Sequence, residues 1–254
     1  MTIKTWCIVS RKIKTVTVAF NFQTFKTRAL TALLFVLVMG VGLLWNFWSF
    51  VVLFTVIHFG CWYEFVKLLK KIYGNKYLLY CLGGLIYITL PVLMIIDLRT
   101  FSKIYTIGFE NKLILDIAIP LCIIFSIWVN DTMAYLVGSF VGKTPLTKIS
   151  PKKTWEGTIG GIVLCLLAIG FLFPLLFGDV LYKSIAPTKT WFIIPILCGI
   201  FGTLGDLFES KLKRMADVKD SGSFMPGHGG FLDRFDSLLF AVPAVWIYVQ
   251  LFLK

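Results

Sequence analysis

Residues 29–63 form the run ALTALLFVLVMGVGLLWNFWSFVVLFTVIHFGCWY, which is 35 residues long and contains no Asp, Glu, Lys or Arg. About 20 apolar residues are enough for a helix to cross the hydrocarbon core of a bilayer, so this run is long enough for two crossings. We place the break between Trp45 and Trp48, because tryptophan favours the membrane–water interface. The run predicts two consecutive membrane-spanning helices.

Similar apolar windows recur along the rest of the chain. They cover residues 77–96, 113–130, 157–177, 191–205 and 237–253. The composition is 58% hydrophobic and only 15% charged, and the mean hydropathy of +0.85 excludes a soluble domain. We therefore expect an all-α, polytopic integral membrane protein with about seven to nine transmembrane helices.

Positive charge predicts the orientation of these spans. The chain has a net charge of +12, and residues 1–28 contain six Lys and Arg but no acid. Further lysines cluster in 67–76, 143–153 and 211–219, that is, after every second window. Because cytoplasmic loops are enriched in Lys and Arg, we expect these segments to face the cytoplasm. Residues 1–28 are interpreted as a basic cytoplasmic extension and not as a cleaved signal peptide.

One polar stripe follows the window that ends at residue 205. If the helix continues, Asp206, Glu209, Ser210 and Lys213 lie at i, i+3, i+4 and i+7 and so share one face. Carboxylate and hydroxyl oxygens are the ligands of Mg²⁺, which is often shared with a substrate phosphate. The alternative is a helix end with ordinary ion pairs between neighbouring turns.

A second acidic group, Asp233, Arg234 and Asp236, opens the last window. Aspartates also cap helix N-termini, so capping is an alternative explanation for one of them. If the last two helices pack together, Asp206 and Asp233 could meet and bind a metal jointly. The preceding PGHGG, residues 226–230, contains glycines that allow backbone N–H groups to approach an anion. His228 in this loop is left as a phosphate donor, a proton carrier or a plain loop residue.

A third group lies further upstream. Asp131, Tyr135 and Ser139 form a polar stripe on an apolar helix, and an acid in a membrane helix suggests a functional site. In the loop SPKKTWEG, residues 150–157, Lys152 and Lys153 could contact phosphates or merely follow the positive-inside bias.

One more acid, Glu64, ends the second span, where it could pair with Lys67 at i+3 or belong to the site.

The segment from Ser210 to Asp236 resembles the signature of the phosphatidate cytidylyltransferase family, also called CDP-diacylglycerol synthases. That signature is S-x-[aliphatic]-K-R, then four residues, K-D-x-G, and P-x-H-G-G-x-x-D-R-x-D, and this chain has the same spacing. Met225 departs mildly from it, because the family more often has Leu, Ile or Phe there. The motifs around Asp131 and in residues 150–157 also resemble the family's upstream motif.

The resemblance implies that CTP and phosphatidate react to CDP-diacylglycerol and pyrophosphate, with Mg²⁺ as cofactor and a second cation left open. By the same resemblance, the metal would be held by Asp206, Asp233 and Ser210. The implied catalytic residues are Asp206, Asp233, Asp236, Lys219 and Arg234. The implied substrate-binding residues are Asp131, Lys152, Lys153, Ser210, Lys213, Arg214, Asp220, His228, Gly229 and Gly230.

The expected partners are CTP, phosphatidate and the lipid bilayer, with no nucleic acid; a homodimer is left open. Residues 29–254 would form a single transmembrane catalytic domain in the cell inner (plasma) membrane, with the site facing the cytoplasm. Three alternatives differ in chemistry. A CTP-dependent polyprenol or dolichol kinase would transfer the γ-phosphate to an alcohol, a cytidylyltransferase for archaeal ether lipids would differ only in its lipid, and a cation transporter would also gather acids at membrane depth.

Overall fold

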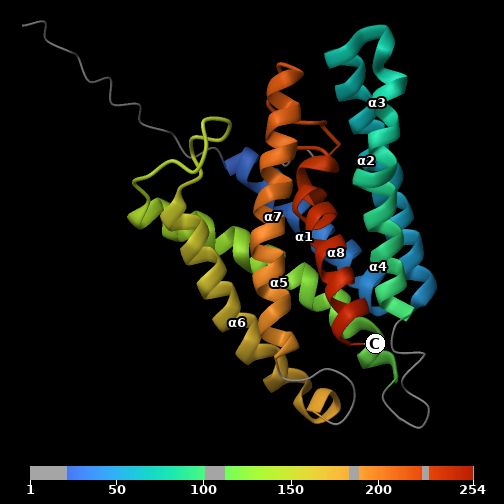
Figure 1. Cartoon of the computed structure of the whole chain (residues 1–254), viewed down its shortest axis with the longest axis vertical. Coiled ribbons are helices and arrows are strands. Elements are labelled where there is room, and N and C mark those ends of the chain that lie inside the picture. The colour runs from blue at the N-terminus through green and yellow to red at the C-terminus, as the bar shows by residue number, and fades with distance from the viewer. Residues whose placement is uncertain (1–21, 101–111, 183–188, 225–228, 254) are drawn as a thin grey trace, which may run out of the picture.

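The computed structural model describes residues 22–100, 112–182, 189–224 and 229–253, and these contain helices but no β-strand. Figure 1 shows the helices packed as a bundle, with α5 crossing it obliquely. Their bounds are α1 (Phe22–Leu44), α2 (Phe47–Tyr73), α3 (Tyr77–Gly84), α4 (Leu90–Thr100), α5 (Lys112–Val141), α6 (Trp155–Tyr182), α7 (Thr190–Met215) and α8 (Leu232–Phe252).

The first apolar run is broken where the sequence predicted. Asn46 caps α2: its side chain accepts a hydrogen bond from the Ser49 backbone N–H at 2.7 Å, and the Ser49 hydroxyl oxygen accepts one from the Asn46 N–H at 3.1 Å. This reciprocal capping box satisfies backbone donors that the helix leaves free at its start. The chain can therefore end α1 and begin α2 here although no charged residue is present.

Five helical segments are long and apolar enough to cross a membrane by length and composition, among the residues that the structure describes. The first of them, Phe47–Thr100, is 54 residues long and reverses direction at the short 3₁₀ turn Gly74–Lys76. It continues through α3, a π-helical turn at Leu85–Thr89 and α4. The all-α, polytopic membrane fold is therefore confirmed, while the number of crossings stays a prediction.

The N-terminal boundary differs slightly from the expected one. Helix α1 begins at Phe22, within the segment assigned to the basic extension, and residues 1–21 lie outside the described part. Ala29–Leu44 is apolar but shorter than the five spanning segments.

The lysine-rich connections lie toward one end of the bundle. The Lys71 ammonium, at the end of α2, donates to the Asp217 carbonyl after α7 at 3.3 Å. Lys153, in the α5–α6 connection, forms an ion pair with Asp206 of α7. Figure 1 shows the end of α2, the end of α7 and the α5–α6 connection in its upper half. This arrangement agrees with the alternation of basic loops in the sequence.

Helices α5 and α6 approach each other closely through small residues. A Cβ added to Gly161 would lie 2.7 Å from the Ala134 Cβ and 2.9 Å from the Ala134 Cα. Such contacts let backbones pack directly, which is the usual means of association between helices in lipid. This packing brings Asp131, one turn before Ala134, beside the loop that joins the two helices.

The close approach generates a stability prediction. Gly161→Ala should lower the apparent melting temperature in detergent, because its methyl group meets backbone atoms that cannot move aside; overpacking of this kind costs about 1–3 kcal/mol. Gly83→Ala is the matched control, since nothing lies within 4 Å of its added Cβ. The control should be neutral or stabilising by about 0.5–1 kcal/mol. Equal melting temperatures for the two variants would contradict the described packing.

Candidate functional site

Two polar cavities meet between α5, α7 and α8. The first has a volume of about 390 Å³ and the second about 600 Å³, and both are lined by Asp131 and Asp206. The first is completed by Phe35, Ile127, Trp128, Thr132, Lys213, Asp233, Arg234 and Asp236. The second includes Tyr135, Ser139, Ser150, Lys152, Lys153, Thr154, Thr158 and Thr203. The polar stripes of the sequence therefore converge on one region.

Helix α7 continues to Met215, as the stripe required. The Ser210 hydroxyl donates to Asp206 Oδ1 at 3.2 Å, and Lys213 forms an ion pair with Glu209. Glu209 is fully buried, and apart from this ion pair neither of its carboxylate oxygens has a hydrogen-bond partner among the described residues. The predicted face is confirmed, and the ion-pair alternative is also partly realised on it.

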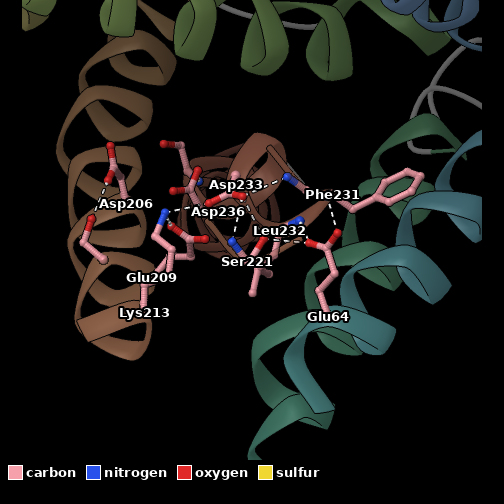
Figure 2. Close-up of polar contacts among 12 residues, drawn as sticks. Glu64, Asp206, Glu209, Lys213, Ser221, Phe231, Leu232, Asp233 and Asp236 are labelled. Atoms are coloured by element: carbon pink, nitrogen blue, oxygen red, sulfur yellow. Dashed lines mark hydrogen bonds and ion pairs between the residues drawn. The ribbon is translucent and has the colours of Figure 1, made fainter. Parts of the chain in front are cut away.

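Among the described acids of the site, Asp233 accepts the most hydrogen bonds (Figure 2). Its Oδ1 accepts from the Lys213 ammonium at 2.6 Å. Its Oδ2 accepts from the Gly230 N–H at 2.8 Å and lies 2.9 Å from both the N–H and the hydroxyl of Ser221. One carboxylate thus joins the loop before α8 to a lysine of α7.

The two acids expected to meet across the α7–α8 interface line the same cavity, but lysines neutralise each of them. Asp206 is paired with Lys153, and Asp233 with Lys213. Asp236 is 7% exposed, and its Oδ1 accepts from the Ser237 N–H at 2.6 Å. Helix α8 therefore directs two carboxylates toward α7.

The loop before α6 is fixed by a carboxylate. Glu156, in the first turn of α6, accepts from the N–H groups of Lys143 and Thr144 at 3.1–3.2 Å. Within the loop, the Leu146 N–H donates to the Lys153 carbonyl at 2.7 Å. The loop is thereby folded back on itself, and this holds Lys152 and Lys153 at the second cavity.

Several predicted site residues lie away from both cavities. Arg214, Lys219 and Asp220 are exposed and line neither of them, whereas the exposed Arg234 lines the first. Gly229 has a φ of +82°, which favours glycine. His228 lies outside the described residues.

For Glu64 the sequence left two alternatives, a pair with Lys67 and a place in the site. No ion pair joins it to Lys67 in the part of the chain that the structure describes, and its side chain is 3% exposed. Its oxygens instead accept from the N–H groups of Phe231 and Leu232 at 3.0 and 2.9 Å and from the Ser221 hydroxyl at 2.7 Å. The only signal in the sequence was an acid at the end of an apolar run, since its partners are more than 150 residues away.

Within the described residues, no group of three or more His, Cys, Asp or Glu side chains is arranged to hold a metal ion. The donors that are present, carboxylates and a hydroxyl, are nevertheless those of Mg²⁺. Among these donors, Asp206 and Asp233 line one cavity, and the Ser210 hydroxyl donates to Asp206.

An apolar groove of about 410 Å³ adjoins the first cavity between α1, α2 and α8. Phe35 lines both of them. The other residues of the groove are Thr31, Leu34, Val38, Met39, Leu53, Val56, Ile57, Phe224, Phe231 and Phe235. A charged cavity and an apolar groove therefore share one wall.

Comparisons with known proteins show which family this chain resembles. The chain is 46% identical over 127 residues to the phosphatidate cytidylyltransferase of Bacillus subtilis, covering 50% of this chain and 45% of that protein. It is 41% identical over 132 residues to that of Thermotoga maritima (52% and 48%) and 48% identical over 128 residues to the chloroplastic phosphatidate cytidylyltransferase 4 of Arabidopsis thaliana (49% and 30%). Each match thus spans less than half of the relative. A family model covers residues 92–252, which include the whole α7–α8 site, so this chain belongs to the cytidylyltransferase family.

Proposed function

We propose that this chain transfers the cytidylyl group of CTP to phosphatidate, giving CDP-diacylglycerol and pyrophosphate in phospholipid biosynthesis. The observation that carries the proposal is the shared wall at Phe35, where the charged cavity adjoins the apolar groove. Phosphatidate likewise has a charged part and an apolar part, since its anionic phosphate is joined to two acyl chains. The three relatives compared above are named phosphatidate cytidylyltransferases, which supports the same activity here.

The phosphate of phosphatidate would occupy the first cavity. Lys213 and Arg234 supply positive charge there, and the arginine can bind a phosphate through two parallel hydrogen bonds. The acyl chains would follow the groove past Phe35 toward α1 and α2. The lipid could then remain largely in the bilayer during the reaction.

CTP would occupy the second cavity, and its α-phosphate would lie near the junction at Asp131 and Asp206. Lys152 and Lys153, which line this cavity, would bind the β- and γ-phosphates, and its hydroxyl groups would serve as donors to the sugar and base. Lys153 would exchange its ion pair with Asp206 for the nucleotide phosphate. The structure therefore has cations on both sides of the expected reaction centre.

In the proposed reaction, an oxygen of the phosphatidate phosphate forms a bond to the α-phosphorus of CTP, and the bond to the bridging oxygen of pyrophosphate breaks. A phosphate monoester is already a nucleophile, so no strong general base is required. The main barrier is the repulsion between the two anions as they approach each other. Fixed positive charges lower this barrier by electrostatic stabilisation. A kinase of the polyprenol type would instead need a base to activate an alcohol.

We further propose that Mg²⁺ binds at this junction, with Asp206, Asp233 and Ser210 as ligands. When bound, the ion would shield the phosphates from one another and stabilise the leaving pyrophosphate. Lys153 and Lys213, which pair with the two aspartates, would share these carboxylates with the ion or release them to it.

Label transfer tests the proposed activity. Purified protein is incubated with phosphatidate, Mg²⁺ and CTP labelled with ³²P at either the α or the γ position. We expect α label in the lipid, γ label in pyrophosphate, and neither product in EDTA. Label that moves from the γ position into an added lipid alcohol would identify a kinase, and no transfer in either assay would reject both enzymes.

Removal of a site carboxylate should abolish the transfer. Asp206→Asn should lower the rate by about 100-fold or more, since a single electrostatic group at a reaction centre typically contributes that much. Asp233→Asn should also lose activity, together with some thermal stability, because Asp233 accepts hydrogen bonds from the backbone N–H groups of Ser221 and Gly230 in the loop before α8.

Asp97→Asn is the matched control for these two variants. Asp97 accepts from Trp246 and Gln250 through Oδ2, and an asparagine carbonyl can accept both bonds. It should retain wild-type activity. Full activity of Asp206→Asn would reject the proposed role of that carboxylate.

We propose that the lysine-rich end of the bundle faces the cytoplasm, where CTP is available. Single cysteines replacing Pro145 and Ser223, in a variant without native cysteines, should react with a membrane-impermeant maleimide only after the cells are opened. Both positions are exposed. Lys189→Cys, in the α6–α7 connection, is the control that should react from outside. The reverse pattern would invert the topology.

A further inference from the structure

Glu64 lies outside the segment that matches the family signature, yet it contacts that segment at three points. It belongs to α2, and its carboxylate accepts hydrogen bonds from the N–H groups of Phe231 and Leu232 and from the Ser221 hydroxyl. Figure 2 shows the Glu64 side chain directed at the start of α8, beside Ser221 and Asp233. The Glu64 side chain thus joins Ser221, in the segment after α7, to the residues at the start of α8.

The start of α8 depends on this contact. No local side chain caps the helix at Phe231, although the first turn of a helix has backbone donors without partners inside the helix. Glu64 satisfies two of these donors, those of Phe231 and Leu232, while Asp233 accepts from Gly230 just before the helix. A carboxylate at a helix N-terminus is also favoured by the helix dipole. The negative charge of Glu64 is therefore stabilised without an ion pair to a lysine or arginine in the described structure.

Ser221 transmits the constraint to Asp233. Its hydroxyl lies 2.7 Å from Glu64 Oε2 and 2.9 Å from Asp233 Oδ2, and its backbone N–H donates to the same Oδ2. A hydroxyl has one proton, so the two carboxylates compete for it. The position of Asp233 is consequently coupled to that of Glu64 through a single side chain.

Two glycines of the signature fit around the Glu64 carboxylate. A Cβ added to Gly222 or to Gly230 would collide with the Glu64 oxygens. Neither glycine has a positive φ, so steric access and not backbone strain explains them. The loop is shaped to enclose this carboxylate.

We propose that Glu64 is a positioning residue, which orients Asp233 toward the reacting phosphates by fixing Ser221 and the start of α8. This inference rests on the proposed function, because Asp233 is there assigned to the cation and the phosphates. We call the contacts of Glu64 with Ser221, Phe231 and Leu232 the Glu64 clamp. Loss of the clamp should therefore reduce turnover and weaken Mg²⁺ activation, without changing the apolar groove that would receive the lipid chains.

The kinetic test uses Glu64→Gln. Both oxygens of Glu64 accept hydrogen bonds, so the amide NH₂ group must face one of the donors. We expect kcat to fall by at least 10-fold, the Mg²⁺ concentration for half-maximal activity to rise several-fold, and KM for phosphatidate to stay within two-fold. The control is Thr190→Val, which removes the hydrogen bond between Thr190 and Tyr248 at the start of α7. It should lower thermal stability but leave kcat unchanged.

A double-mutant cycle tests the clamp without any activity measurement. Gly222→Ala and Glu64→Ala should each lower the melting temperature, and the double variant should lose less than the sum, because the removed side chain leaves room for the new methyl group. Strict additivity would show that the two residues do not touch and would overturn the clamp.

The two tests separate the possible failures. A wild-type protein that transfers no label contradicts the proposed function, whereas the cycle still reports on the clamp. An active wild type combined with an unchanged kcat and Mg²⁺ dependence in Glu64→Gln overturns the positioning role alone.

Discussion

The cost of burying carboxylates determines how the helices around the site can be arranged. An ion that leaves water for a protein interior loses several kcal/mol of solvation, which must be offset by a counter-charge or by hydrogen bonds. The acids of this site use both means. Lys213 binds Glu209 and Asp233 together, so one ammonium group contacts carboxylates on two helices. This shared cation requires α7 and α8 to lie side by side.

The partners of the other acids come from distant parts of the chain. Asp206 of α7 is paired with Lys153 from the α5–α6 connection, and Glu64 of α2 binds the N-terminus of α8. Each of these contacts joins segments that are far apart in sequence. The site is therefore also a set of cross-links within the bundle, and a change at one acid alters the packing of two elements. This explains why the effects of substitutions on activity and on stability must be measured together.

Much of the fold and part of the site could be predicted from the sequence. Apolar windows, the break at Asn46 and the i, i+3, i+4, i+7 stripe on α7 depend on local spacing, which the sequence contains directly. The partner of Glu64 depends instead on how α2 meets α8 in space. Local spacing suggested Lys67, three residues away, but tertiary packing placed backbone donors of α8 closer. The exposure of Lys219 and Asp220 could not be predicted for the same reason, since a motif gives the order of residues but not the direction of their side chains.

The glycines of the signature illustrate how far a motif depends on residues outside it. The sequence suggested that glycines near residues 226–230 allow backbone N–H groups to approach a bound anion. In the structure, the anion that the N–H groups of Phe231 and Leu232 contact is the carboxylate of Glu64, and Gly222 and Gly230 leave the space that it occupies. The Glu64 carboxylate thus occupies a position at backbone N–H groups that a bound phosphate could otherwise take. In the proposed function, a ligand phosphate would instead lie in the charged cavity that Asp233 lines, so the contact that closes one side of the loop would also limit where the reaction can occur.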